Sequence, residues 1–244
     1  METLGDDLAL LSVAPNGKIH QGQRLAIALA GSELVRLAER GQVDVADGRI
    51  VVREAEPTGD AELDLALASL LQAGRPPKAR VWVARPRRGI VEGYLGRLET
   101  SGALRSETAL FGIRWRIADP GRVSLTAARL DAIACSAGRV DTADAAFGGL
   151  AHAAGIDEIL YRGLATRERR ARLRRIAEGK VAWAEPTSGA IPDAVGGAAK
   201  AAQAADAASR AAAHAATQAA MSAATAAAAS AAAAAAAVAA GPVT

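Results

Sequence analysis

Two runs of arginine and lysine could bind anions, because guanidinium and ammonium groups form charge-assisted hydrogen bonds with phosphates and carboxylates. The first run, in RPPKARVWVARPRRG, lies among prolines and consists of Arg75, Lys78, Arg80, Arg85, Arg87 and Arg88. The second, in TRERRARLRRIAEGK, falls on a predicted helix and consists of Arg167, Arg169, Arg170, Arg172, Arg174, Arg175 and Lys180. Such runs have three interpretations: a solvated face, which ranks first for a single run, a nucleic-acid footprint and a membrane-surface patch. We rank nucleic acid last, because no recognition helix, zinc finger or aromatic RNA-binding pattern accompanies them.

No other residue pattern argues for catalysis or metal binding. The three histidines, His20, His152 and His214, are far apart in the chain and lack partners at metal-ligand spacing. The motifs of serine hydrolases, nucleotide-binding loops and zinc proteases do not occur. We therefore expect a protein that is not an enzyme and that holds no metal or cofactor. Cys135, the single cysteine, lies in an apolar helical context and is expected to be a small buried residue.

The composition indicates a protein of ordinary charge with a modest core. The chain has 244 residues, with 29 Lys and Arg against 26 Asp and Glu, which gives a net charge of +3. Hydrophobic residues make up 51% of it, but alanine supplies much of that fraction and buries little area. Near the N-terminus, Asp6 and Asp7 stand where a signal peptide would carry positive charge, so we expect a cytoplasmic protein.

The elements that must position these side chains begin with two helices and a hairpin. Leu4 to Val13 is predicted to be a short helix that ends in a Pro-Asn-Gly turn. From 23 to 40, the leucines recur at helical spacing, and Gly41 follows as a C-terminal cap. In QVDVADGRIVV, valines alternate with polar residues on either side of Asp47-Gly48, which predicts a β-hairpin at about 43–53.

Further helices follow in the middle of the chain. Thr58 or Asp60 can cap a helix whose inward-facing residues are predicted to be Leu63, Leu67, Leu70 and Leu71. The two prolines of GRPPKARVW interrupt the pattern, and a helix is expected again from Gly89 to Thr100. The remaining predicted helices are at about 124–136, 141–155 and 165–178. The fold class is therefore mainly α.

The stretch ETALFGIRWRIADP, Glu107 to Pro120, concentrates large apolar residues in a chain that has only 3% aromatic residues. Ala109, Phe111, Ile113, Trp115 and Ile117 alternate with Arg114 and Arg116. This period of two predicts a strand that is buried on one face. Its second half, from Ile113 to Ile117, best fits that interpretation.

The C-terminal part of the chain is an alanine-rich segment of low complexity. Alanine favours a helix locally, but without a stripe of large apolar residues little is expected to dock that helix on a core. We favour a solvated tail over a membrane-spanning helix, because alanine gains little in lipid and no anchoring residues flank the segment. We predict two parts, a domain at 1–185 and an alanine-rich tail at 186–244.

The order of five motifs resembles the Golgi phosphoprotein 3 family over residues 3–180. In sequence these are TLGDDLALLSVAPNGK, ALAGSELVRLAERGQVDVADGRIVV, EPTGDAELDLAL, YLGRLETSGAL and AAFGGLAHAAGIDEIL. The resemblance implies a compact multi-helix domain with small β-hairpins at about 43–53 and 104–117. It also implies a peripheral membrane protein that reads phosphatidylinositol 4-phosphate, at the Golgi membrane in eukaryotic relatives. An apolar hairpin would enter the bilayer, and membrane-protein clients and oligomer contacts belong to the same expectation.

The resemblance carries over to individual residues only in part. Of the family's headgroup-contacting positions Arg88 matches one, whereas Gln21, Ala30 and Val91 stand at three others. Nearby arginines could substitute for the missing groups, and the headgroup-binding residues are therefore predicted to be Arg24, Arg85, Arg87 and Arg88. The hairpin tip falls near Glu107 to Gly112, so the membrane-inserting residues are predicted to be Leu110, Phe111 and Ile113.

These observations leave two hypotheses on function. The first is a non-enzymatic peripheral membrane protein on the cytoplasmic face of a membrane, which binds anionic phospholipid headgroups through the basic patch and the hairpin. The alternative is a soluble protein-interaction scaffold or regulator without lipid specificity, which uses the same hairpin to form a homo-oligomer.

Overall fold

The computed structural model of the chain describes residues 3–109, 112–184 and 189–239, with side chains described as far as residue 222. It is 63% helical, which confirms the predicted fold class. Contacts between residues divide the chain into two units, one ending at Gln203 and one beginning at Ala204, and each is considered by itself. We predicted the domain boundary at 185, whereas the first compact unit extends to Gln203.

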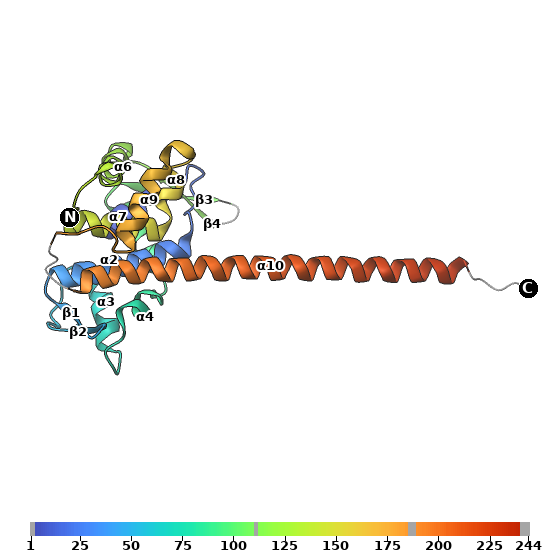
Figure 1. Cartoon of the computed structure of the whole chain (residues 1–244), viewed down its shortest axis with the longest axis horizontal. Coiled ribbons are helices and arrows are strands. Elements are labelled where there is room, and N and C mark those ends of the chain that lie inside the picture. The colour runs from blue at the N-terminus through green and yellow to red at the C-terminus, as the bar shows by residue number, and fades with distance from the viewer. Residues whose placement is uncertain (1–2, 110–111, 185–188, 240–244) are drawn as a thin grey trace, which may run out of the picture. The chain divides into compact units, whose positions relative to one another are not determined.

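Helices and two small hairpins succeed one another along the chain (Figure 1). They are α1 (Leu4–Leu11), α2 (Gly22–Glu39), β1 (Val43–Ala46), β2 (Arg49–Val52), α3 (Ala61–Leu71), α4 (Ala79–Val83), α5 (Ile90–Thr100), β3 (Leu104–Ala109), β4 (Gly112–Ile117), α6 (Pro120–Cys135), α7 (Thr142–Ala154), α8 (Ile156–Leu160), a 3-10 turn (Leu164–Thr166), α9 (Arg167–Ala177) and α10 (Ala190–Ala239). The predicted helices and both hairpins are present, with boundaries shifted by a few residues, as helix ends commonly are. The short helices α4 and α8 were not expected.

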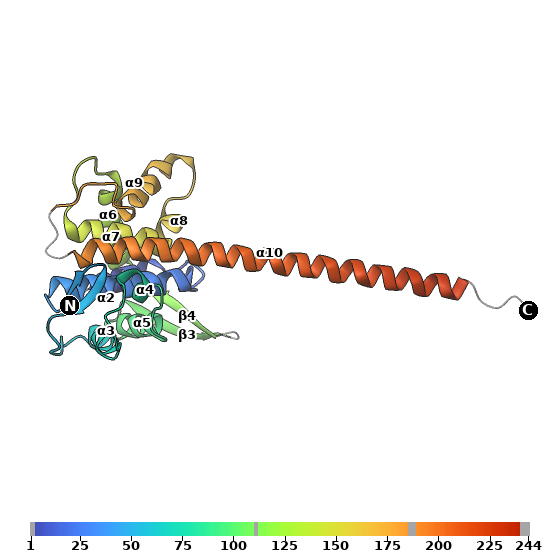
Figure 2. The same cartoon turned by 60° about the horizontal axis from the view of Figure 1, so that its bottom comes forward.

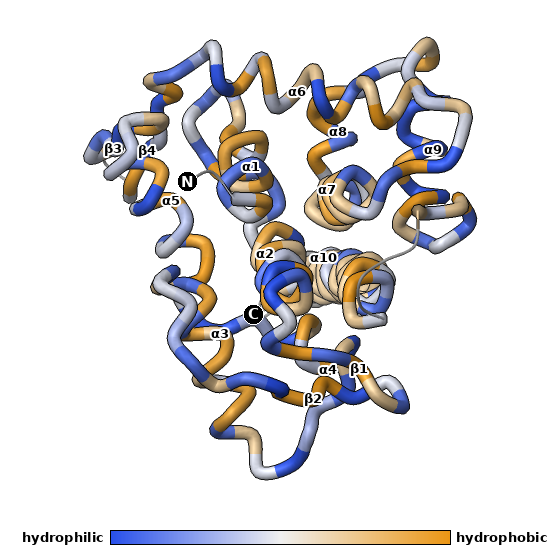
Figure 3. Tube along the Cα trace, turned by 90° about the vertical axis from the view of Figure 1, so that its left-hand side faces the viewer, coloured by the Kyte–Doolittle hydropathy of each residue, from blue (hydrophilic) through white to orange (hydrophobic). Residues whose placement is uncertain are grey.

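Helix α2 is the centre of the first unit. Its four leucines at helical spacing, Leu25, Leu29, Leu34 and Leu37, have no exposed side-chain surface. Helices α1, α3, α5 and α7 contact it on different sides, so its apolar residues are covered almost all round. Figure 3 shows the hydrophobic segments of α1, α2 and α7 gathered in this centre.

The hairpin at β1–β2 has the turn that its sequence predicts. Val43 pairs with Val52 and Ala46 with Arg49, so the two strands are joined by Asp47 and Gly48 alone. Both have positive φ angles, 52° at Asp47 and 70° at Gly48. That conformation matches the twist of the strands, and Asp-Gly is among the pairs that adopt it most readily.

Two predictions about burial at single helical positions are wrong, and both fail at the last residue of a helix. Leu63, Leu67 and Leu70 form the inward side of α3, but Leu71 is 52% exposed, because one further residue turns the side chain about 100° away. Cys135 is exposed at the end of α6, one position beyond the inward-facing Ile133 and Ala134. Of the two predicted caps of α3, Thr58 and Asp60, the structure has Asp60, whose side chain accepts hydrogen bonds from two backbone N–H groups of the first turn.

The beginning of α10 belongs to the first unit, contrary to the prediction that little would dock the alanine-rich segment. Ile191, Ala194, Val195 and Ala198 are fully buried. Figures 1 and 2 both show these first turns of α10 running beside α2. The approach is close, since a Cβ atom added at Gly31 of α2 would lie 3.3 Å from the Cβ of Ala198. Small side chains on both helices replace the missing stripe of large apolar residues.

Helix α7 meets the same turns of α10 through Gly149, and this contact gives a test of the packing. A Cβ atom at Gly149 would lie 2.4 Å from Cγ1 of Val195 and 3.4 Å from the backbone of Ala177. We expect Gly149→Ala to lower the free energy of unfolding by about 1–3 kcal/mol through overpacking, measured by urea denaturation.

The matched control is Gly96→Ala in α5. Nothing lies within 4 Å of a Cβ atom at that position. This substitution should stabilise the protein by about 0.5–1 kcal/mol, because alanine is the better helix former. Equal effects of the two substitutions would contradict a tight contact between α7 and α10.

Candidate membrane-binding surface

The β3–β4 hairpin exposes both of its faces. Leu104 pairs with Ile117 at the base, and Ala109 pairs with Gly112 at the other end. Of the described strand residues, Leu104 alone is buried, whereas Ile113 is 61% and Ile117 40% exposed. The predicted half-buried strand is thus wrong for these two isoleucines and holds at Trp115, which is half-buried. Because this two-stranded ribbon extends beyond the core, most of its side chains on both faces are exposed.

The hairpin is nonetheless held firmly at its base. The backbone N–H of Ala118 donates to the carbonyl of Ala103 at 2.9 Å, and Leu104 is completely buried. The carboxylate of Glu99, on the last turn of α5, accepts hydrogen bonds from the backbone N–H and the hydroxyl of Ser106 at 2.9 and 2.6 Å. These bonds lower the pKa of Glu99, because they favour its charged form.

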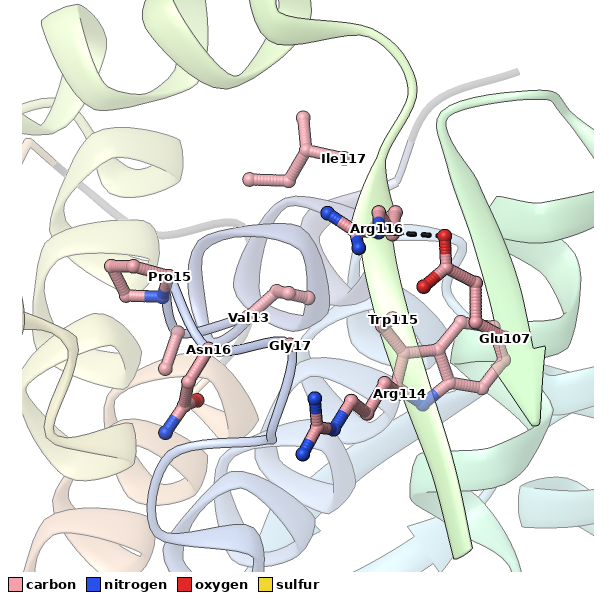
Figure 4. Close-up of a pocket in the computed structure, with 10 residues that line it drawn as sticks. Val13, Pro15, Asn16, Gly17, Glu107, Arg114, Trp115, Arg116 and Ile117 are labelled. Carbon is pink, nitrogen blue, oxygen red and sulfur yellow. Dashed lines mark hydrogen bonds and ion pairs between the residues drawn. The ribbon is translucent and has the colours of Figure 1, made fainter. Parts of the chain in front are cut away.

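The loop between α1 and α2 lies against strand β4 (Figure 4). Trp115 donates its backbone N–H to the carbonyl of Gly17 at 2.8 Å. A cavity of about 380 Å³ separates the rest of this loop from the strand, and residues 13–17, Glu107 and 114–117 line it. A second cavity, of about 630 Å³, lies beside it and is lined by Lys18, Ile19 and the outer part of the hairpin.

Positive charge accompanies the exposed apolar side chains of the hairpin. Arg105, Arg114 and Arg116 are all exposed. Arg116 pairs across the strands with Glu107 at 2.6 Å, but both side chains are largely in solvent, where such a pair contributes little. Two of the predicted inserting residues, Leu110 and Phe111, lie outside the described residues, and the third is Ile113.

Two of the four predicted headgroup arginines are free to bind a ligand. Arg85 and Arg88 lie in the connection between α4 and α5 and are exposed. Neither side chain forms a hydrogen bond or ion pair with any residue that the structure describes. Gly89 follows as the N-cap of α5, with a φ angle of 75° that glycine adopts readily, so the connection ends at this residue.

Arg87 is engaged inside the protein instead. Its Nη2 atom donates to Oε1 of Glu33 at 2.8 Å and also contacts Oε2 of Glu62, and its side chain is 21% exposed. Glu33 is almost fully buried on α2, and burial raises its pKa to about 7 despite the neighbouring guanidinium. The pairing ties the 85–88 segment to α2 and α3.

Arg24 is also engaged, at the beginning of α2. Its three nitrogen atoms donate to the carbonyls of Ala153 and His152 and to Oε1 of Glu158, each at 2.8 Å. The last carbonyls of a helix lack the partners that earlier ones have, and Arg24 donates to two of them at the end of α7, of which the His152 carbonyl also accepts from the backbone N–H of Gly155. The pKa of Glu158 is lowered by this pairing although burial opposes it. Arg24 lies one turn before Ala28 and two turns before Gly31, on the apolar side of α2, and this position in the sequence indicates a buried role.

The residues at the other headgroup-contacting positions of the family also have structural roles in this protein. Gln21 has a φ angle of 47° and donates its side-chain amide to Oε2 of Glu158 at 3.0 Å. Ala30 is buried in α2, and Val91 is half-buried in the first turn of α5. The structure therefore separates the predicted arginines into an exposed pair, Arg85 and Arg88, and an internally paired set, Arg24 and Arg87.

In the part of the chain that the structure describes, no group of three or more His, Cys, Asp or Glu side chains could hold a metal ion. None of its helices has the length and apolar character needed to cross a bilayer.

The fold and this surface define a mainly helical protein that carries an exposed, cationic hairpin. The family model of Golgi phosphoprotein 3 (GPP34) matches residues 4–195, and the chain belongs to this family. The resemblance found in the sequence is confirmed, and the match continues past 180 into the first turns of α10. A search of the curated proteins found no significant match.

Proposed function

We propose that this protein is a non-enzymatic peripheral membrane protein that binds anionic phospholipid headgroups on the cytoplasmic face of a membrane. The observation that carries the proposal is the β3–β4 hairpin, which exposes apolar and cationic side chains together. Ile113 and Ile117 would enter the interface, while Arg105, Arg114 and Arg116 would stay at the level of the headgroups. Membership of the family supports this use of the hairpin.

Arg85 and Arg88 supply a second group of cations. Each arginine close to an anionic surface contributes about 1 kcal/mol to binding at physiological salt. Neither side chain has to leave an ion pair in order to do so, unlike Arg87. We therefore assign the main electrostatic contribution outside the hairpin to these two residues.

The headgroup that the family resemblance implies is phosphatidylinositol 4-phosphate. We propose that selectivity for it is weak, because Arg24 and Arg87 are committed to carboxylates and carbonyls of the protein. A charge-assisted hydrogen bond contributes about 1.5–3 kcal/mol, so losing the expected contacts removes much of the specific affinity. Attraction to negative surface charge does not depend on these contacts.

Vesicle co-sedimentation tests the proposal. We expect the double variant Arg85→Gln/Arg88→Gln to bind phosphatidylserine-containing vesicles about thirtyfold more weakly than the wild type, which corresponds to the loss of about 2 kcal/mol. Arg175→Gln, an exposed arginine on α9, is the matched control and should have little effect. The proposal would be contradicted if the wild-type protein did not bind anionic vesicles, or if the double variant bound them as well as the wild type.

A soluble, self-associating scaffold is the alternative function. It is favoured by the same hairpin, because a two-stranded ribbon has backbone edges that can pair with a second copy. Light scattering on the same samples separates the two. An oligomer that is disrupted by Ile113→Asp, in a protein without affinity for vesicles, would support the scaffold.

A further inference from the structure

The arginine run on α9 is divided by the structure into two sets. Arg169 donates to Oδ1 of Asp131 at 2.6 Å, and Arg172 is buried and donates to the carbonyl of Gly138 at 2.5 Å. These two hold α9 against α6 and the turn after it. The remaining arginines of α9, which are Arg167, Arg170, Arg174 and Arg175, are exposed.

Three of them, Arg167, Arg170 and Arg174, are spaced by three and four residues and therefore lie on one face of α9. They line a cavity of about 480 Å³, within the range of about 300–1,000 Å³ typical of small-molecule sites. The side chains of Arg167 and Arg174 form no ion pair or hydrogen bond with any described residue. Two carboxylates outside this lining, Glu158 and Glu178, interact electrostatically with Arg170 and Arg174, and each is also paired with another cation, Arg24 and Lys180, at 2.8 Å.

The opposite wall of the cavity contains His152, from α7, and Asp157, from α8. Nδ1 of His152 lies 2.9 Å from Oδ2 of Asp157, which fixes the ring and leaves Nε2 as the nitrogen available to a ligand. The same carboxylate oxygen lies 3.8 Å from Nε of Arg170, so it also orients that guanidinium. Asp157 is buried, with 1% of its side chain exposed, and acts from behind the cavity wall.

We propose that this pocket binds a phosphomonoester dianion, with Arg167, Arg170 and Arg174 as its cationic ligands. Three guanidinium groups face one buried carboxylate, so the pocket has an excess of positive charge. Guanidinium groups match the oxygens of a phosphate in geometry, and a terminal phosphate offers three oxygens to them. His152, in the wall of the pocket, would orient the phosphate through its Nε2 atom.

A phosphomonoester fits these observations better than a nucleic acid. The arginines converge on a concave site and do not extend along a groove that could follow a nucleic-acid backbone. None of the residues that line the cavity is Phe, Tyr or Trp, whereas proteins that bind single strands stack the bases on such side chains. The site is also separate from the proposed membrane-binding surface, because it contains neither hairpin residues nor residues of the 85–88 segment.

The test is calorimetric titration of the full chain with glycerol 3-phosphate, and with glycerophosphocholine as a phosphodiester control. We expect saturable binding of the monoester alone, and binding at least about tenfold weaker in Arg167→Gln/Arg174→Gln. Arg175→Gln lies on the same helix outside the cavity and should bind like the wild type. All three substituted arginines are exposed, and thermal melting of each variant will show that its fold is intact.

The same variants identify the source of the phosphate. If vesicles that contain phosphatidic acid lose binding to the double variant but those with phosphatidylserine do not, the ligand is a lipid monoester. If only glycerol 3-phosphate is affected, the ligand is soluble. Absence of saturable monoester binding, equal binding by the double variant and the wild type, or binding of a single-stranded oligonucleotide in place of the monoester would each overturn the proposal.

Discussion

Replacing Arg24 with glutamine is expected to lower the free energy of unfolding by about 2–3 kcal/mol, because the carbonyl of Ala153 loses its charged donor, whereas the pair with Glu158 is partly screened by solvent. The shorter side chain cannot reach the carbonyls of His152 and Ala153 and the carboxylate of Glu158 together. Buried acceptors without partners are costly, and Glu158 would lose the cation that lowers its pKa. This is the largest single effect that we expect from any arginine predicted to contact a headgroup.

Urea denaturation measures the loss, and Arg53→Gln is the control. Arg53 pairs with Asp44 at 3.5 Å on the surface, with 56% of its side chain exposed, so its removal should cost less than about 1 kcal/mol. Vesicle binding of folded Arg24→Gln should equal that of the wild type. The reverse outcome, normal stability with weakened vesicle binding, would make Arg24 a headgroup ligand and reject its structural role.

A second large effect concerns pH and Glu33. Burial raises the pKa of Glu33 to about 7 in the folded protein, against 4.5 as the ordinary value. Between these two pH values the folded state holds a proton that the unfolded chain has released, so raising the pH lowers the free energy of unfolding. One pKa unit corresponds to about 1.4 kcal/mol, which gives a loss of about 2–3 kcal/mol between pH 5 and pH 8.

Glu33→Gln isolates this contribution. The difference in the free energy of unfolding between the variant and the wild type should shift by about 2–3 kcal/mol in favour of the variant from pH 5 to pH 8. Glu99→Gln is the control, because Glu99 has a lowered pKa and is ionised in both states over this range. A constant difference for Glu33→Gln would show that Arg87 keeps Glu33 charged throughout.

Local sequence signals were sufficient for most of the fold. The leucines of α2, the cap at Asp60 and the Asp47-Gly48 turn each depend on a few neighbouring residues, and each is confirmed. The two burial predictions that failed in helices did so because one residue at the end of an element decided the outcome. Leu71 and Cys135 follow inward-facing residues directly, and helical spacing alone does not show at which residue the packing stops.

The candidate site was less accessible to sequence reasoning, because arginines of identical type have different partners. Arg85 and Arg87 are two residues apart, yet one is in solvent and the other reaches Glu33, which lies 54 residues earlier in the chain. Likewise, the side chain of Arg24 donates to backbone carbonyl groups at the end of α7. Every residue has such a carbonyl group, so the sequence does not show which ones will accept this bond. Such pairings follow from the tertiary arrangement and could not be deduced from charge alone.

The docked beginning of α10 changes how much information its alanines carry. At Ala194 and Ala198 alanine is needed for its small size, since both residues are fully buried where α10 passes close to Gly31 of α2. Over residues 207–222 the side chains are exposed, and there the same letter specifies only a preference for helix. In the first turns of α10, alanine is therefore required for its small size, whereas in the later turns it contributes only its helix propensity. The alanine content of the sequence does not distinguish these two roles.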